Sequence, residues 1–565
     1  MTSKPRYSLS VDRLAWLTIL LVLIVPGAFA EDPSPAPTPL SPLNASIQAL
    51  LREGVQPKLK WGQFPDFQPQ LEQLYQASGY APLWTVNGTP INQAEQVLAS
   101  LAEADRNGLS SVDYDAELLR HWFAEINSKT DATPQNLASF DVSLSLSLMR
   151  YASNLYVGRV NPRHVNFGLS IEPKRLDLPT LLTKIAHSPK AAEQIEALQP
   201  KLKLYEQLKS ALARYQVLAK ENQTAEFIFP AKFKPGNRHA QVPVLRHFLS
   251  VLGDLPMETH GSDIYDKDLA EGVKRFQRRH GLGADGVIGK TTLTQLNYPL
   301  NDRVRQIQLG LERLRWLPDH IDGRYLIVNI PSFQLFGFDN GDDKPAIEMN
   351  VIVGEAINER NTPVFHSDMT YMTFRPYWNV PYKITAKEYF PQIARNPGYL
   401  AKNNLEIVTN FSPNSPVYEP SSEHIQMLST GALKLRQKPG PKNALGLVKF
   451  SFPNTNNVYL HSTPTQGLFK KARRDFSHGC IRVEFPVKLA EYVLKEHEEW
   501  PKERIEETMQ GGKTKTVTLK TPIPVYIFYS TVLANETDQV MFYDDIYGHD
   551  LILQNQLAKG FPYPP

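Results

Sequence analysis

The sequence has few cysteines, little net charge and no metal-binding histidine spacing, and each of these absences excludes a class of protein. Its 565 residues contain a single cysteine, Cys480, so no disulfide can form within the chain. Basic and acidic residues nearly balance, and a formal net charge of +3 gives no sign of a nucleic-acid partner. Its histidines show no His-x-x-x-His spacing and no cysteine pairing, so neither a zinc site nor any other metal site is predicted; the scattered ones are His260, His280, His366 and His424.

The apolar run at the N-terminus is too short for a typical membrane span. It extends only from Leu14 to Val25, whereas a spanning helix needs about 20 apolar residues. Basic residues precede the run, and Ala28-Phe29-Ala30 follows it as a small-x-small cleavage site. Residues 1–30 are therefore predicted to be a secretory signal peptide, with an uncleaved anchor as the alternative. The proline-rich residues 31–43 are predicted to be an extended tether.

A lone cysteine is unusual in an exported chain, because exported proteins commonly pair their cysteines. It lies in Ser477-His478-Gly479-Cys480-Ile481-Arg482-Val483, downstream of Val458-Tyr459-Leu460-His461. Both stretches alternate as strands do, so Tyr459 shares a face with His461, and Cys480 shares one with Arg482. This context favours a nucleophile over a buried small hydrophobic residue.

The chemistry of such a thiol requires a base. An unperturbed thiol is only a few per cent ionised at neutral pH, and a nearby imidazole could take its proton. Two candidates exist, His461 and the adjacent His478, and strand geometry alone excludes neither. Gly479 would allow a tight turn before the thiol, and Arg482 would either bind a carboxylate or favour the thiolate, unless it is only structural.

Four regions are expected in the folded part of the chain. Residues 44–228 have mostly helical periodicity and are predicted to be a scaffold domain. Residues 232–297 form a compact three-helix module with a glycine-rich turn that lacks the features of a phosphate loop. Residues 303–535 are rich in short β runs and are predicted to form an antiparallel sandwich or barrel. Residues 382–447 interrupt this sheet as a proline-rich capping insertion, either a lid or a decorative loop, and residues 536–565 are a C-terminal extension. The predicted class is multidomain α+β.

His461, its spacer and Ser477-His478-Gly479-Cys480-Ile481-Arg482 resemble the signature of the L,D-transpeptidases, enzymes of the YkuD fold that act on bacterial cell walls. Thr362-Pro363 and Tyr377-Trp378-Asn379-Val380-Pro381 also look like that family. The order of elements in residues 232–297 resembles a peptidoglycan-binding domain. The whole arrangement is similar to a large periplasmic subfamily with a scaffold domain and a capping insertion.

This resemblance implies a reaction and its site. Cys480 would be acylated by a peptidoglycan stem tetrapeptide with loss of D-Ala, and an amine of a second stem peptide would accept the acyl group in a 3→3 cross-link. No cofactor is implied, the compartment would be the periplasm, and other cell-wall synthesis enzymes there are candidate partners. His461 would be the base, oriented by the Ser462 carbonyl, and backbone amides around His478, Gly479 and Cys480 would form the oxyanion hole. The residues expected to bind substrate are Arg482, Tyr459, Trp378 and Ser477. Hydrolysis of the acyl-enzyme and a non-catalytic wall-binding scaffold remain the alternatives.

Overall fold

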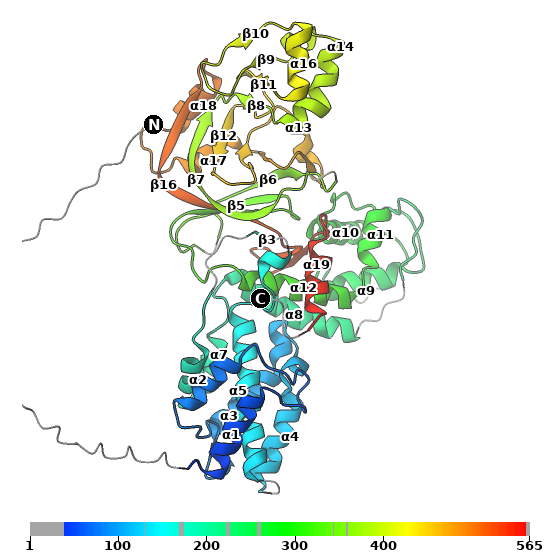
Figure 1. Ribbon diagram of the computed structural model, residues 1–565. Coiled ribbons are helices and arrows are strands. Elements are labelled where there is room, and N and C mark those ends of the chain that lie inside the picture. The colour runs from blue at the N-terminus through cyan, green and yellow to red at the C-terminus, as the bar shows by residue number, and fades with distance from the viewer. Residues whose placement is uncertain are drawn as a thin grey trace, which may run out of the picture. The chain divides into compact units, whose positions relative to one another are not determined.

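The computed structural model describes residues 39–129, 132–165, 167–168, 174–221, 226–256, 262–342, 344–357 and 360–560. The predicted signal peptide, most of the tether and His260 lie outside these ranges. Within them, the predicted multidomain α+β class is confirmed, because helices dominate the first half and a large sheet dominates the second (Figure 1). None of the helices in the described part is long and apolar enough to cross a membrane.

The N-terminal region packs around one helix that is buried on nearly every side, α5. Its Asp141 carboxylate accepts hydrogen bonds from the Leu83 and Trp84 amides at 2.8 and 2.9 Å, and from the Tyr75 hydroxyl at 2.8 Å. These bonds compensate a buried charge and attach α2 and the following loop to α5. The elements are α1 Pro42–Glu53, α2 Gln68–Gln76, β1 Thr85–Val86, β2 Thr89–Pro90, α3 Asn92–Ala102, α4 Ala116–Asn127, α5 Pro134–Tyr156, α6 Leu178–Ala186, α7 Ala191–Glu196 and α8 Lys203–Glu221.

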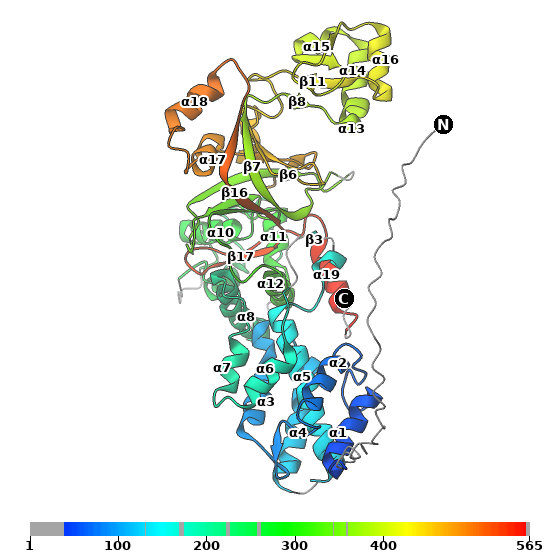
Figure 2. The same cartoon turned by 60° about the vertical axis from the view of Figure 1, so that its left-hand side comes forward.

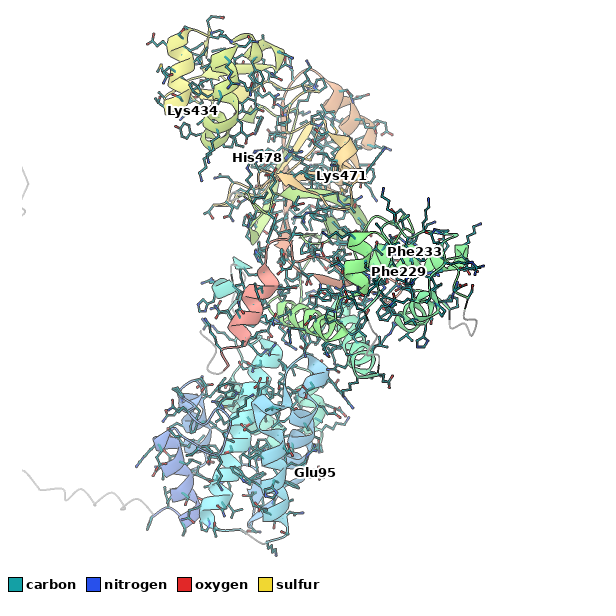
Figure 3. The ribbon with its side chains drawn as sticks, turned by 90° about the vertical axis from the view of Figure 1, so that its right-hand side faces the viewer. Glu95, Phe229, Phe233, Lys434, Lys471 and His478 are labelled. Atoms are coloured by element: carbon teal, nitrogen blue, oxygen red, sulfur yellow. The ribbon has the colours of Figure 1, made fainter. Side chains whose placement is uncertain are left out.

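The next module contains three helices, α9 Val242–Leu252, α10 Lys267–Arg279 and α11 Lys290–Leu296. Asp266 caps α10 by accepting from the Leu269 amide at 2.9 Å, and Gly253 ends α9 in the left-handed conformation. Phe229 and Phe233, labelled in Figure 3, stack with ring centroids 4.8 Å apart in its core. Helix α12, Leu300–Arg315, then leads into the sheet.

The β region closes into a barrel. Its strands pair in the order β12-β13-β15-β6-β5-β4-β16-β7, and β7 pairs again with β12, which completes the ring. Figure 1 shows β5, β6, β7 and β16 curving around this core. The strands are β4 Tyr325–Asn329, β5 Gln334–Phe338, β6 Ile347–Gly354, β7 Val364–Phe374, β12 Val448–Ser451, β13 Leu460–His461, β14 Asp475–Ser477, β15 Ile481–Val483 and β16 Lys515–Phe528; the helices α17 Pro486–Val493 and α18 Lys502–Gln510 follow β15.

The capping insertion has a small core and a sheet of its own, ordered β10-β9-β11-β8. Strand β8 lies before residue 382 and pairs with β11, so this substructure begins earlier than the sequence suggested. Figure 2 shows α13, α14, α15, β8 and β11 gathered together. The elements are β8 Trp378–Asn379, α13 Tyr382–Ile384, the π-helical turn η4 Thr385–Tyr389, α14 Phe390–Arg395, α15 Gly398–Lys402, β9 Leu405–Val408, β10 Val417–Tyr418, α16 Ser422–Thr430 and β11 Lys434–Gln437.

Two segments outside the barrel support it. Strand β3, Phe167–Gly168, was expected within a helical region but pairs in parallel with β7. The C-terminal elements are β17 Val532–Ala534, β18 Val540–Phe542 and α19 His549–Leu557. Just before α19, the Tyr547 hydroxyl donates to the Gly354 carbonyl at 2.6 Å and accepts from the Thr362 amide at 3.2 Å. Tyr547 therefore holds Gly354 and Thr362 in place, and the Thr362 hydroxyl donates to the Gly479 carbonyl next to the cysteine.

Candidate active site

Two short parallel strands bring the predicted site residues together. In the β13–β15 pair, Leu460 lies opposite Ile481, and His461 lies opposite Arg482. Leu460 and Ile481 are fully buried in the barrel core. Alternation therefore places their neighbours on the other face, with Tyr459 beside Cys480 and His461 beside Arg482.

The imidazole and the thiol are diagonal neighbours on that face. Adjacent strands lie about 4.8 Å apart and two residues span about 6.6 Å, so the Cα atoms of His461 and Cys480 are roughly 8 Å apart. Side chains on one sheet face can interact across such a diagonal. The arrangement brings a base and a nucleophile from distant parts of the sequence within reach of each other.

A lysine that was not predicted from the sequence lies on the same sheet face as His461 and Arg482. In the antiparallel β12–β13 pair, Lys449 lies opposite His461. The sheet face thus carries Lys449, His461 and Arg482 side by side on three neighbouring strands. The imidazole lies between two cations.

His461 is held in one tautomer by its own backbone. Its Nδ1 lies 2.6 Å from the Ser462 carbonyl oxygen. A carbonyl can only accept, so Nδ1 carries the proton and Nε2 keeps a lone pair. His461 is only 4 % exposed; burial, followed by the charges of Arg482 and Lys449, lowers its pKa to about 3. The ring is therefore neutral at physiological pH.

Gly446 lets the chain pack closely behind this histidine. Its φ of +63° is left-handed, and a Cβ built there would lie 2.5 Å from Ser462 Oγ and 2.7 Å from the Ser462 carbonyl carbon. Any side chain at this position would push on the residue whose carbonyl orients His461. The glycine is therefore part of the support for the base.

The Cys480 thiol is partly buried, and burial raises its pKa. Four interactions oppose this effect: the side chain and the amide of Tyr459 hydrogen-bond to the sulfur, and Lys449 and Arg482 attract its negative form. The Tyr459 hydroxyl interacts in turn with Trp378 from β8. Because indole N–H can only donate, this defines a chain from Trp378 through Tyr459 to the sulfur.

The loop before the cysteine is fixed from within. The Ser477 hydroxyl donates to the Cys480 carbonyl at 2.5 Å and accepts from the Gly479 amide at 3.2 Å. Gly479 has a φ of +115°, a conformation that side chains rarely adopt. Thr362, buried beneath the loop, donates its hydroxyl proton to the Gly479 carbonyl at 2.8 Å and accepts from the Gly354 amide at 2.9 Å.

These bonds change two expectations about the loop. Ser477 is 2 % exposed, and its hydroxyl is engaged by backbone atoms, so it shapes the turn and is not available to a substrate. The Gly479 amide already donates to Ser477, which removes it from the predicted oxyanion hole. Among the described residues, the amides of His478 and Cys480 make no hydrogen bond and remain available.

His478 points to the capping insertion. Its Nε2 lies 2.7 Å from Glu388 Oε1 on the turn η4, and the same oxygen accepts from Arg360 Nη2 at 2.9 Å. Arg360 also pairs with Glu355 at 3.1 Å. His478, labelled in Figure 3, is therefore an attachment point between the cysteine loop and the capping insertion.

A cavity of about 460 Å³ lies behind the base and does not include the thiol. Cys480, Tyr459 and Arg482 are absent from its lining, so this cavity is separate from the nucleophile. Its lining residues are Pro441, Gly446, Leu447, Ser462, Thr463, Pro464, Gln466, Pro486, Val487, Glu506, Met509 and Gln510. Among the described residues, no group of three His, Cys, Asp or Glu side chains could hold a metal ion.

Comparison with known proteins gives three matches along the chain. Residues 69–212 match the family model described as "Scaffold domain", residues 238–296 match "Putative peptidoglycan binding domain", and residues 323–527 match the YkuD "L,D-transpeptidase catalytic domain". A curated relative from Haemophilus influenzae, "Putative L,D-transpeptidase", is 33% identical over 247 residues. The match covers 44% of this chain and 48% of the relative, so the chain spans about half the length of that protein.

Two solved structures were also found. An L,D-transpeptidase from Xylanimonas cellulosilytica aligns with 54% of this chain and 100% of its own at 13% identity and a TM-score of 0.16. One from Stackebrandtia nassauensis aligns with 53% and 97% at 14% identity and a TM-score of 0.21. The similarity to L,D-transpeptidases therefore depends on the family models and on the Haemophilus relative.

Proposed function

We propose that the chain is a peptidoglycan L,D-transpeptidase that works through an acyl-enzyme on Cys480, since residues 323–527 match the YkuD model of the L,D-transpeptidase catalytic domain. The observation that carries this proposal is the register of β13 and β15. It gathers the only thiol of the chain, an imidazole with a free Nε2 lone pair, and an arginine on one sheet face.

In the first step, the Cys480 sulfur attacks the carbonyl carbon of the third stem residue. The thiol proton passes to Nε2 of His461 as the carbon–sulfur bond forms. The tetrahedral oxyanion is stabilised by the amides of His478 and Cys480, which donate to no other group among the described residues. When the carbon–nitrogen bond breaks, His461 returns the proton to the nitrogen and D-Ala leaves.

The electrostatics of His461 suit the second half of this step. With a pKa of about 3, the neutral ring is a weak base, but its protonated form is a strong acid. It therefore gives its proton readily to the departing amine. The cations beside it compensate for the weak basicity, because they stabilise the negative charge on sulfur that develops during attack.

The second step transfers the acyl group. An amine from a neighbouring stem peptide attacks the thioester and gives a proton to His461, and the sulfur leaves as thiolate and is reprotonated. The product is a 3→3 cross-link. Attack by water instead of the amine would give a tripeptide, so the same site supports hydrolysis when the acceptor is missing.

The surroundings of the thiol suit a peptide substrate. The Arg482 side chain forms no hydrogen bond or ion pair among the described residues, which leaves its guanidinium available to bind a donor carboxylate. The side chains of Tyr459 and Trp378 interact beside the thiol, and Trp378 belongs to the sheet of the capping insertion. We assign this insertion the role of a lid, attached through Glu388, over the donor site.

The remaining assignments follow from this function. The three-helix module would hold the enzyme on its polymer, and other cell-wall synthesis enzymes are the expected partners. The compartment would be the periplasm, reached through the predicted signal peptide.

Product analysis tests the proposal. The full chain is incubated with a purified disaccharide-tetrapeptide, and the products are separated and weighed by mass spectrometry. A dimer lacking one D-Ala is expected. Tripeptide alone would establish hydrolysis instead of transfer, and unchanged substrate would leave only the wall-binding role.

A further inference from the structure

Lys449 is a half-buried cation that no carboxylate of the described residues pairs with. Its ammonium lies over the Tyr459 ring, with Nζ 4.0 Å from the centroid. No carboxylate pairs with it in the described part of the chain, and burial lowers its pKa. Removing an unpaired ammonium from water costs free energy, and one cation–π contact offsets only part of that cost. The position therefore calls for a function.

The nearest group that can become negative is the thiol. Lys449 lies opposite His461 on β12, and the ring beneath its ammonium belongs to Tyr459, whose hydroxyl hydrogen-bonds to the Cys480 sulfur. A cation on a phenol ring makes the phenol proton more acidic and a better donor. Lys449 can thus favour negative sulfur in two ways, directly through space and indirectly through Tyr459.

We propose that Lys449 is a positioning residue for the acyl-transfer reaction, which holds the Cys480 sulfur ready for ionisation through Tyr459. The proposal rests on the proposed function of Cys480 as the nucleophile. In the strand register Lys449 lies opposite His461 and not opposite Cys480, so it acts on the sulfur from a distance. It supplies the positive charge that a buried thiolate needs while the neighbouring imidazole stays neutral.

The other groups that face the thiol come from three strands. His461 belongs to β13 and Tyr459 directly precedes that strand, Arg482 belongs to β15, and Glu355, which follows β6, acts on Arg482. Arg482 provides a second cation on the far side of His461. Removal of Lys449 is therefore expected to weaken, and not to abolish, the ionisation of the thiol.

Alkylation kinetics test this role without any substrate. Because Cys480 is the only cysteine, the intact mass of the full chain reports modification at one site. Iodoacetamide is neutral, so its rate between pH 5 and 10 follows the thiolate fraction and is not biased by attraction to lysine. For Lys449→Met we expect a rate at pH 7 about tenfold lower and a midpoint at higher pH, with an unchanged plateau at high pH. Lys449→Arg should restore the rate to within about threefold.

A matched control and a coupled variant make the test specific. Lys515 also lies over an aromatic ring, with Nζ 4.7 Å from the Trp500 centroid, on another strand of the same barrel. Lys515→Met should leave the alkylation profile unchanged. In a Tyr459→Phe background, Lys449→Met should slow alkylation by less than it does in the parent, because part of its effect passes through the hydroxyl.

Three outcomes would overturn the proposal. The first is an alkylation profile of Lys449→Met identical to that of the parent. The second is a failure of Lys449→Arg to restore the rate while both variants keep the parental melting temperature, which would mean that shape matters and charge does not. The third is slowing with anionic iodoacetate but not with iodoacetamide, which would make Lys449 a carboxylate-binding residue. Since no peptidoglycan is involved, none of these results depends on whether transfer or hydrolysis occurs.

Discussion

The neutrality of His461 should appear as a dependence of local stability on pH. Its pKa of about 3 in the folded protein lies far below its ordinary value of 6.5. Between these two values the unfolded chain binds a proton at His461 and the folded chain does not. Stability is therefore lost as the pH falls below 6.5, and the loss ends only below the folded pKa.

The size of the effect follows from the same two values. Between the two pKa values, each decrease of one pH unit lowers the free energy of local opening by about 1.4 kcal/mol. At pH 5.0 this free energy should therefore be about 2 kcal/mol lower than at pH 7.5. This corresponds to roughly a thirtyfold increase in local opening of β13. His461→Gln keeps a side-chain donor for the Ser462 carbonyl but cannot titrate, so it should remove this pH dependence.

Hydrogen–deuterium exchange gives the measurement. Peptides covering β13 and β15 are followed at pH 5.0 and 7.5 in the parent and in His461→Gln, and rates are corrected for intrinsic exchange. Other histidines also titrate, but they contribute equally to both proteins, so the difference between the two pH effects isolates His461. His121→Gln, at an exposed position on α4, is the control and should change that difference by less than about 0.5 kcal/mol.

A difference close to zero would refute the reasoning. It would mean that the folded imidazole titrates near its ordinary pKa, and that burial between Lys449 and Arg482 does not suppress its protonation. A resting thiolate–imidazolium pair would then be the better description of the site.

Two further predictions concern the support of the site. Gly446→Ala should destabilise the barrel by about 2 kcal/mol in equilibrium unfolding, because it places a side chain at positive φ and against Ser462. Acylation of the enzyme should also slow at least tenfold, because His461 loses its orientation. An unchanged acylation rate would show that the Ser462 carbonyl does not orient His461. Glu388→Gln should loosen the capping insertion, because it removes the charge that holds Arg360 and weakens the contact to His478, together worth roughly 0.5–1 kcal/mol at this partly exposed position. Amide exchange in η4 and α14 should become about threefold faster. Protection equal to that of the parent would mean that other contacts hold the capping insertion.

The local patterns around the cysteine predicted which side chains share a strand face, but not which residues lie opposite each other. Period-two alternation is a property of a single strand and follows from the residues themselves. Register depends on pairing between distant segments, so the position of Cys480 beside Tyr459, and of His461 beside Arg482, came only from the structure.

Residues that act through long-range contacts were missed for the same reason. Lys449 alternates with Val448 and Phe450 as any outward-facing lysine would, and nothing local connects it with the thiol. Glu388 lies in a segment predicted only to be a capping insertion, and Tyr547 lies in what was predicted only to be an extension.

The helical regions were easier to predict than the sheet. Apolar periodicity and capping residues such as Asp266 are local signals, and the three helices of the second module follow them closely. Closure of the barrel through the β7–β12 pair, and the contribution of Phe167–Gly168 to it, involve no local signal. A sandwich or barrel of short strands could be predicted, but the strand pairs that close the barrel could not.

The most direct test of the central claim is the mass of the enzyme during turnover. The full chain is mixed with disaccharide-tetrapeptide in the absence of an acceptor, quenched in acid and weighed intact, and the modified peptide is then sequenced. We predict an adduct equal to the donor minus D-Ala, carried by Cys480 and absent from Cys480→Ala. Cross-linked or trimmed product formed by Cys480→Ala at the parental rate, or an adduct on any other residue, would contradict the account.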